Sequence, residues 1–281
     1  MNDWSIWTFC YAMGKLPLDF LSGSPINSNR GTVDVPMFIK SRNNELILVD
    51  TGFATGESMT GNKFADFVRS DQLLKLFGFD PAQVHKVVLT HLHFDHAGNL
   101  EGFPNAQFYV QRYEYDAWKQ VIRKYQDTPN SKYHWAFSSL NRDDFIVLDR
   151  LIEQGRVTFL DGDADISNGL TCRLAKDTHT FGSQWLQIKT TEGDFVCAGD
   201  CCYTFENLRR MWPPGYLQGN VWNMLNTFEE MKEVAGEDLC RLIPGHDIHL
   251  FDHYPAGQAH GVRFVEAHLA QGQGSLLNHQ Y

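Results

Sequence analysis

Residues 91–96 constrain the possible fold and chemistry of this chain more than any other segment. They read His-Leu-His-Phe-Asp-His and directly follow residues 85–90, an apolar run typical of a buried strand. Side chains two residues apart in an extended segment point to the same side, so His91 and His93 can hold one metal ion. The aspartate and the last histidine begin the next turn, where they can reach a second ion. Because α/β folds place ligands at the carboxyl ends of strands, the segment predicts a metal site at the end of a central strand.

Strand-like and helix-like stretches alternate along the rest of the chain. Strands are predicted at residues 4–9, 35–40, 45–51, 85–90 and 107–111, in short pieces between residues 156 and 199, and at 242–244. Helices are predicted at residues 71–77, 112–126 and 142–154, from residue 227 to residue 233, and at 258–270. Residues 18–34 are rich in Ser, Gly and Asn and predict a long loop, and Asn43-Asn44 predicts a hairpin turn. The pattern favours two sheets packed face to face and covered by helices, an αββα sandwich in one domain over residues 1–281.

Composition and charge exclude several classes of function. The chain carries 24 Lys and Arg against 34 Asp and Glu, a net charge of −10, and has no basic run. A protein that binds nucleic-acid phosphates or an anionic membrane needs the opposite sign, so we expect a small-molecule ligand and neither of those partners. No stretch approaches about 18 consecutive apolar residues, and the first residues do not resemble a signal peptide, which predicts a cytoplasmic protein. Six thinly spread cysteines predict reduced, mostly buried thiols.

Three more candidate ligands each follow a strand-like run: His179, Asp200 and His246. In this order, after the His-x-His-x-Asp-His segment, they resemble the dinuclear hydrolases of the metallo-β-lactamase fold, over roughly residues 35–250. The resemblance implies a four-layer αββα fold and two divalent metal ions. It implies that one ion is bound by His91, His93 and His179, that the other is bound by Asp95, His96 and His246, and that Asp200 bridges both.

Two other segments bear on this resemblance. Val49-Asp50-Thr51-Gly52 matches a family segment in which the aspartate orients a histidine ligand, so Asp50 is expected to support the metal site. An aspartate that only ends a strand is the alternative. The Pro-Gly pair that the family has before its third histidine is Asp177-Thr178 here, which leaves the setting of that loop open and could add charge near the ions.

The proposed ligands favour hydrolytic chemistry. A mixture of imidazole and carboxylate suits zinc first, and manganese, iron or cobalt would fit similar ligands. Two ions about 3.5–4 Å apart can share a hydroxide and polarise a carbonyl at the same time. The implied reaction is attack of that hydroxide on an acyl carbon, with no serine or cysteine nucleophile.

Tyr203 follows Asp200 by three residues, and the third strand-end histidine lies in Gly245-His246-Asp247. Both features are similar to the N-acyl homoserine lactonase branch of the family, which implies a quorum-quenching lactonase acting on a small lactone. A phenol at this offset could donate a proton to the alkoxide released as the ring opens. Tyr203, Asp95 and Asp200 are therefore the candidate catalytic residues. Simple packing of a buried tyrosine under the site is the alternative for Tyr203.

Other functions on the same fold are kept as alternatives. A thioesterase of the glyoxalase II type relies on basic residues in its C-terminal region, whereas the chain after His246 has one arginine, Arg263, and no lysine. A non-catalytic relative would be expected to have lost ligands, and all seven are present. Two aromatic-rich stretches, residues 113–137 and 203–222, could line a substrate pocket or form core and interface, and the sequence leaves both this choice and a homodimer open.

Overall fold

The computed structural model describes residues 3–17, 20–21, 29–34, 37–41, 45–57, 63–125, 127 and 137–278 of the chain. One sheet has eight strands in the order β14 (Ala256–Ala259), β15 (Val262–His268), β1 (Trp4–Phe9), β4 (Met37–Ser41), β5 (Leu46–Val49), β6 (Lys86–Val88), β7 (Gln107–Gln111) and β8 (Val157–Leu160). A second sheet has five strands in the order β13 (Leu242–Ile243), β12 (Gly193–Cys197), β11 (Gly182–Thr190), β10 (Leu170–Lys176) and β9 (Ala164–Ser167). A separate hairpin consists of β2 (Ala12–Pro17) and β3 (Asn29–Asp34).

Alternation along the central strands explains why the two sheets pack against each other. In β5, Leu46 and Leu48 belong to the core on the helix-covered side, and Ile47 and Val49 belong to the core shared with the five-stranded sheet. Successive side chains of a strand point to opposite faces, so both faces of this strand are apolar and buried. The strand pairs in parallel with β6, which pairs in parallel with β7.

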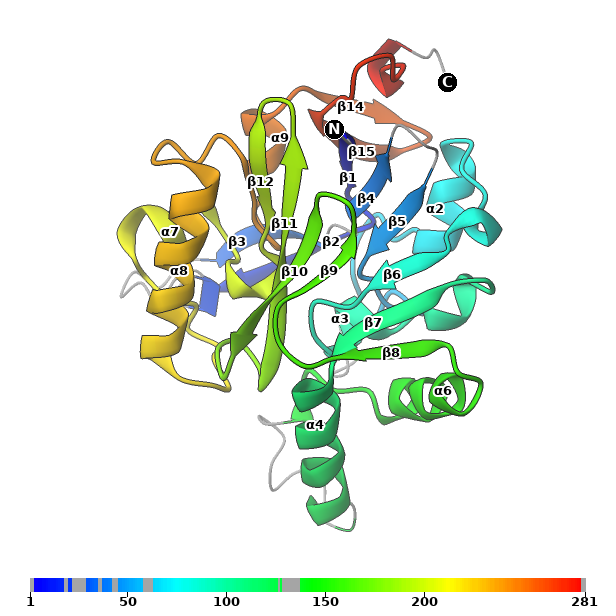
Figure 1. Cartoon of the computed structure of the whole chain (residues 1–281), viewed down its shortest axis with the longest axis vertical. Coiled ribbons are helices and arrows are strands. Elements are labelled where there is room, and N and C mark those ends of the chain that lie inside the picture. The colour runs from blue at the N-terminus through cyan, green and yellow to red at the C-terminus, as the bar shows by residue number, and fades with distance from the viewer. Residues whose placement is uncertain are drawn as a thin grey trace.

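Helices cover the outer face of each sheet (Figure 1). On the eight-stranded side, α2 (Ser70–Leu76), α4 (Arg112–Tyr125) and α6 (Arg142–Glu153) bury apolar residues in one cluster with β5, β6 and β7. On the other side, α8 (Val221–Ala235) packs on β10 and β12, and Figure 1 shows α7 (Phe205–Arg210) beside it. The predicted four-layer αββα sandwich is confirmed. Within the described part of the chain, no helix has both the length and the apolar character needed to cross a membrane.

The helix predicted at residues 258–270 is wrong, because this segment forms the antiparallel pair β14 and β15. Two residues with positive φ, His260 (52°) and Gly261 (79°), connect the strands. A two-residue turn with both φ values positive matches the right-handed twist of a hairpin and is incompatible with a continuous helix. The buried residues of β15 are spaced closely enough to imitate a helical period, which explains the error.

The loop predicted at residues 18–34 is also wrong in part. Residues 29–34 form β3, which pairs in register with β2, from Ala12 opposite Asp34 to Pro17 opposite Asn29. The mostly polar sequence of β3, which contains one glycine, gave no strand signal. The remainder of that prediction, apart from residues 20–21, lies outside the described residues, as does the turn predicted at Asn43-Asn44.

Most other predicted elements are found where the sequence placed them. β1 and β7 match the strands predicted at residues 4–9 and 107–111, and α4 and α6 match the predicted helices through residues 125 and 153. The helix predicted from residue 227 begins earlier, at Val221, where the Asn220 side chain accepts hydrogen bonds from two backbone N–H groups. Such an N-cap satisfies donors that have no partner within the helix.

Candidate metal centre

The chemistry-bearing residues lie where strands and short turns end near one another. His91 and His93 lie in the segment after β6, which leads into the four-residue helix α3 (Phe94–Ala97). α3 carries Asp95 and His96. The remaining three come from the five-stranded sheet: His179 lies between β10 and β11, Asp200 lies on the turn η3 (Gly199–Cys201) after β12, and His246 follows β13. His91 and His246 are 155 positions apart in the chain, yet both lie beside Asp200, because strands of both sheets end at the same edge.

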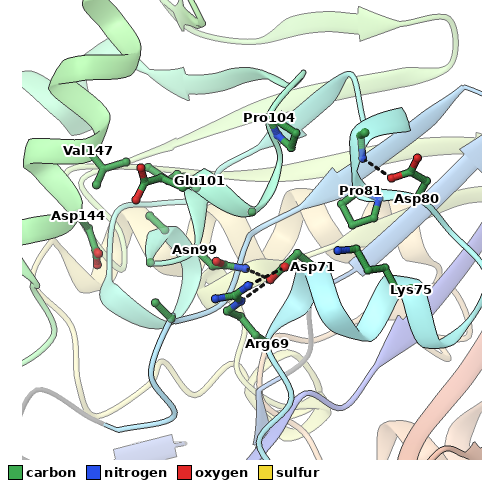
Figure 2. Close-up of a pocket in the computed structure, with 16 residues that line it drawn as sticks. Arg69, Asp71, Lys75, Asp80, Pro81, Asn99, Glu101, Pro104, Asp144 and Val147 are labelled. Carbon is green, nitrogen blue, oxygen red and sulfur yellow. Dashed lines mark hydrogen bonds and ion pairs between the residues drawn. The ribbon is translucent and has the colours of Figure 1, made fainter.

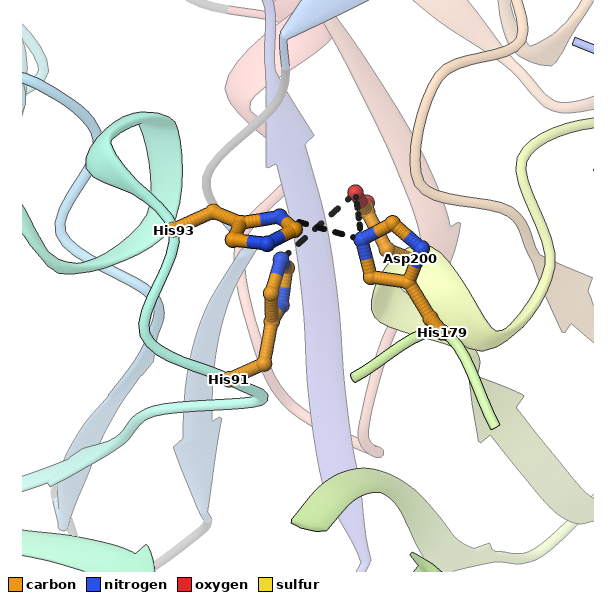
Figure 3. Close-up of side chains that lie close together, drawn as sticks. All are labelled: His91, His93, His179 and Asp200. Atoms are coloured by element: carbon orange, nitrogen blue, oxygen red, sulfur yellow. Dashed lines mark hydrogen bonds and ion pairs between the residues drawn. The ribbon is translucent and has the colours of Figure 1, made fainter. Parts of the chain in front are cut away.

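One group consists of His91, His93, His179 and Asp200, all buried, with one nitrogen or oxygen atom from each within 4.8 Å of the others. His179 Nε2 lies 3.1 Å from His93 Nδ1 and 3.2 Å from Asp200 Oδ2. His91 Nε2 lies 3.6 Å from the same Asp200 oxygen. Figure 3 shows the three imidazole rings and the carboxylate turned toward one another. Three nitrogens and one oxygen around a common point form a donor set for one transition-metal ion.

A second group consists of Asp95, His96 and His246, again with one atom of each within 4.8 Å of the others. Asp95 Oδ2 lies 3.7 Å from His96 Nε2 and 3.9 Å from His246 Nε2. The other oxygen of Asp200, Oδ1, lies 3.1 Å from His96 Nε2 and 2.9 Å from His246 Nε2. The two oxygens of Asp200 therefore face different groups.

The unsatisfied polar atoms of this cluster fit a pair of divalent cations. His91 Nε2, His96 Nε2 and Asp200 Oδ1 are buried and make no hydrogen bond among the residues described. A buried polar atom without a partner costs about 1–3 kcal/mol, and native proteins contain few of them. Each of these atoms is one that would donate a lone pair to a cation. The cluster is thus a buried His/Asp site suited to divalent metals.

Burial and charge set the protonation of the histidines. Burial lowers the pKa of His91 and His93 well below the usual value, and neighbouring imidazoles add to that effect. Burial also opposes the charged form of His96, but the carboxylates of Asp200, Asp95 and Asp50 outweigh it and raise the pKa of His96 well above the usual value. Neutral imidazole is the form that binds a metal. His91 and His93 are therefore in the ligand form without needing to lose a proton.

Asp50 lies at the end of β5 and contacts the second group. Its Oδ2 lies 2.7 Å from His96 Nδ1 and accepts a hydrogen bond from Thr90 Oγ1 at 2.8 Å, and its Oδ1 accepts one from Thr90 N at 2.7 Å. With Nδ1 engaged in this way, His96 presents Nε2 to the cluster. Asp50 has φ of 60°, a conformation that aspartate tolerates better than most residues. Such strain is typical of functional sites.

Tyr203 is buried beside both groups. Its ring centroid lies 5.4 Å from that of His179 and 5.1 Å from that of His246. Burial, together with the nearby Asp200 and Asp95 carboxylates, raises the pKa of Tyr203 well above the usual value. The phenol is therefore protonated at neutral pH, the form that can donate a hydrogen bond.

Sequence reasoning missed two residues that contact the cluster. Gln218 Oε1 lies 3.1 Å from His93 Nε2, the ring nitrogen that faces away from the cluster, and the Gln218 backbone N–H donates to the carbonyl of His179. Glu114 is fully buried and accepts hydrogen bonds from the segments that carry His93 and His179. The sequence held one signal for Glu114, since it lies four residues before the buried Trp118 on the same face of α4. It held none for Gln218.

Asp177-Thr178, the pair that replaces the Pro-Gly of the family, forms side-chain hydrogen bonds with neighbouring residues. Asp177 has φ of 51°, its carboxylate accepts a hydrogen bond from the Tyr113 hydroxyl at 3.0 Å, and it is not one of the residues grouped in the cluster. The Thr178 hydroxyl donates to the carbonyl of Ala175 at 2.7 Å. The loop is thus held by local hydrogen bonds.

All six cysteines are free thiols, and five of them are buried. Cys201 and Cys202 flank Asp200, yet both belong to the apolar core. Burial raises the pKa of both thiols, which keeps them protonated. They act as small packing residues, which agrees with the reduced, mostly buried thiols expected from the sequence.

A cavity of about 420 Å³ lies away from this cluster, between α2, α6 and the turns η1 (Pro81–Gln83) and η2 (Leu100–Gly102) (Figure 2). Its lining is polar and includes Arg69, Asp71, Lys75 and Asp144, but none of the seven clustered residues. Arg69 and Asp71 form an ion pair in its wall, with Arg69 Nε 2.6 Å from Asp71 Oδ1. This cavity therefore does not mark the candidate site, whereas the convergence of donor atoms does.

The fold and the cluster together define a class of protein. Residues 36–246 match the family model described as the metallo-beta-lactamase superfamily, which covers most of the chain. The protein belongs to the metallo-β-lactamase superfamily, so the resemblance inferred from the sequence is confirmed.

Among its relatives is the N-acyl homoserine lactonase AttM of Rhizobium johnstonii, which is 28% identical over 183 residues. The match spans 62% of this chain and 62% of that relative. A solved N-acyl homoserine lactone hydrolase with the product N-hexanoyl-L-homoserine bound at its catalytic metal centre superposes with a TM-score of 0.70 at 21% identity, covering 90% of this chain and 96% of that one. The dizinc quorum-quenching lactonase AidC superposes with a TM-score of 0.66 at 15% identity, covering 88% of each chain. At these identities the structural likeness establishes the shared fold.

Proposed function

We propose that this protein is a dinuclear metal-dependent hydrolase that opens lactone rings, with N-acyl homoserine lactones or other apolar lactones as substrates. The observation that carries the proposal is the placement of Asp200, whose two carboxylate oxygens face two separate groups of buried ligand atoms. A single-ion site would need only one of these groups. The substrate class is supported by the related N-acyl homoserine lactonase AttM and by the similar hydrolase that has N-hexanoyl-L-homoserine bound at its catalytic metal centre.

Each ion would be held by a distinct set of residues. The first would be bound by His91, His93, His179 and Asp200, and the second by Asp95, His96, His246 and Asp200. Two divalent ions held in this way supply an activated water as nucleophile and positive charge for the carbonyl oxygen of the substrate. Zinc is our proposal for both, because imidazole and carboxylate suit it and because the similar AidC is a dizinc enzyme.

Other residues of the protein orient these ligands and donate the proton that the leaving oxygen needs. Asp50 holds His96 with Nε2 toward the cluster, and Gln218 holds His93 with Nδ1 toward it. Tyr203, protonated and next to His179 and His246, would donate its proton to the alkoxide oxygen that leaves the acyl carbon when the ring opens. The proton that the nucleophilic water loses would reprotonate the Tyr203 phenolate, so the net reaction consumes one water and yields the hydroxy acid.

Thioester hydrolysis on the same fold is the weaker candidate. The single arginine after His246, Arg263, lies 4.0 Å from the ring centroid of Phe251 and is engaged in that stacking contact. A polyanionic thioester such as a glutathione conjugate needs basic residues, but the segment after His246 has no lysine, and its single arginine already stacks on Phe251. A neutral lactone makes no such demand on the C-terminal region.

A substrate panel tests the proposal. The zinc-loaded protein is given acyl homoserine lactones of increasing chain length, a lactone without an acyl chain, a glutathione thioester and a phosphodiester, and ring opening or release is followed directly. We expect acyl homoserine lactones to be hydrolysed with the highest kcat/KM. Preferential hydrolysis of the thioester or the phosphodiester by the same preparation would replace the lactonase proposal with the corresponding alternative.

A further inference from the structure

Glu114, in the first turn of α4, is a carboxylate with no exposed surface and no ion pair within the described residues. Its Oε1 accepts hydrogen bonds from Leu92 N at 3.1 Å and Trp118 Nε1 at 2.8 Å. Its Oε2 accepts from Thr180 Oγ1 at 2.8 Å and Gly182 N at 2.6 Å. Every partner is a donor, which matches the ionised form of a carboxylate, an acceptor at both oxygens.

These donors come from the two segments that carry the first group of ligands. Leu92 lies between His91 and His93 in the chain, and Thr180 follows His179 directly. One oxygen of Glu114 thus holds the backbone between two histidines of one sheet. The other oxygen holds the Thr180 hydroxyl and the Gly182 N–H, just after the third histidine, which belongs to the other sheet. The side chain spans the gap between the two segments.

Close packing shows that this contact is built into the fold. A Cβ atom at Gly182 would lie 2.5 Å from the backbone nitrogen of Glu114, a distance that no side chain tolerates. Glycine at this position lets the His179 segment approach the first turn of α4 closely enough for the 2.6 Å hydrogen bond.

We propose that Glu114 is a positioning residue for the first metal group, holding His91, His93 and His179 at the mutual distances that one ion requires. The inference rests on the proposed dinuclear function and adds a role specific to one of its two ions. The second group is supported differently, since Asp50 contacts His96 there. Loss of Glu114 should therefore lower the affinity for the first ion and leave the affinity for the second ion unchanged.

Glu114→Gln is the test substitution, because it keeps the shape and removes one acceptor. In one orientation the new NH₂ group faces the N–H groups of Leu92 and Trp118, and in the other it faces the N–H of Gly182. Neither orientation restores the four hydrogen bonds. Glu229→Gln, which changes an exposed glutamate on α8, is the matched control. Thr180→Val is a milder second variant that deletes a single donor to Oε2.

Zinc affinity of the full chain is measured for each ion by competition with a chelator, alongside circular dichroism and the visible spectrum of the cobalt-substituted protein. For Glu114→Gln we expect one of two ions to bind about 10–100-fold more weakly, with the other unchanged, an altered cobalt spectrum, and lactone turnover that recovers at high zinc concentration. Thr180→Val should weaken the binding of the same ion by a smaller factor. Glu229→Gln should leave the affinity for both ions unchanged.

Two outcomes would overturn the inference. One is a folded Glu114→Gln protein that binds both ions with wild-type affinity. The other is an equal loss of both ions, which would mean a general structural role. If Glu114→Gln does not fold, Thr180→Val decides, and unchanged affinity for both ions in that variant also overturns the inference. Failure of the wild-type protein to bind two ions or to open lactones would instead contradict the proposed function.

Discussion

Asp200 is the buried carboxylate whose charge most requires compensation in this site. It is almost fully buried, and the nearby histidines His246, His96 and His179 hold its pKa well below the usual value although burial acts in the opposite direction. An ionised carboxylate in such a place requires compensation by positive charge. The two divalent cations proposed for this site would provide it, and they would also give partners to the buried imidazole nitrogens.

Substitution of Tyr203 separates the contribution of proton donation from that of metal binding. We expect Tyr203→Phe to lower kcat for lactone hydrolysis about 100-fold, within the range of general acid catalysis, because the departing alkoxide loses its donor. Metal content should stay the same, since the ring packs beside His179 and His246 without contributing a ligand atom to either group. The measurement is steady-state kinetics together with metal analysis on the same preparation. A Tyr203→Phe protein with unchanged turnover would leave Tyr203 a packing residue.

At the residue scale, the sequence predicted the candidates that lie close together in the chain or end a strand. His91 to His96 are adjacent, so their spacing alone indicated a site. Gln218 could not be predicted, because it reaches His93 across 125 positions of sequence, from a loop without a motif. Glu114 could be predicted only as a charge on an apolar helix face, since its four donors are set by tertiary packing.

At the scale of elements, the loop after α7 is pressed against the loop that carries His179. The Gln218 N–H donates to the carbonyl of His179 at 3.0 Å, and the Asn220 N–H donates to that of Asp177 at 2.7 Å. Between them, a Cβ atom on Gly219 would lie 2.2 Å from the carbonyl oxygen of Thr178. The position therefore admits only glycine.

This contact predicts the effect of Gly219→Ala. We expect a loss of about 1–3 kcal/mol in the free energy of unfolding, as in other overpacked sites, and a fall in lactone turnover because the His179 loop must move. Thermal melting and kinetics measure both. Gly274→Ala is the control, since a Cβ there meets nothing within 4 Å. A Gly219→Ala protein as stable and active as the control would show that the two loops are not coupled.

Elements differ in how far the sequence determines them. β5 and β6 bury apolar residues on both faces and were predicted, because a strand of this kind can be recognised from its own composition. β3 and the β14–β15 hairpin were not, because their pairing partners, rather than their own composition, make them strands. In β14 and β15 the decisive signal was the turn at His260-Gly261, which outweighs the spacing of apolar residues.

At the scale of the molecule, the site exists only because two sheets are packed face to face. The eight-stranded sheet supplies His91, His93, Asp95 and His96, and the five-stranded sheet supplies His179, Asp200 and His246. Loss of contact between the sheets would separate the two sets. Ions bound by both sets would add their binding free energy to the stability of the fold.

A zinc titration of the metal-free protein tests the central claim most directly. The protein is stripped with a chelator, zinc is added stepwise, and lactone turnover and bound zinc per chain are recorded at each step. The account predicts that the stripped protein is inactive and melts at a lower temperature, and that turnover reaches its maximum at two bound ions per chain. Full turnover without metal, or with a single ion and no further uptake, would contradict it.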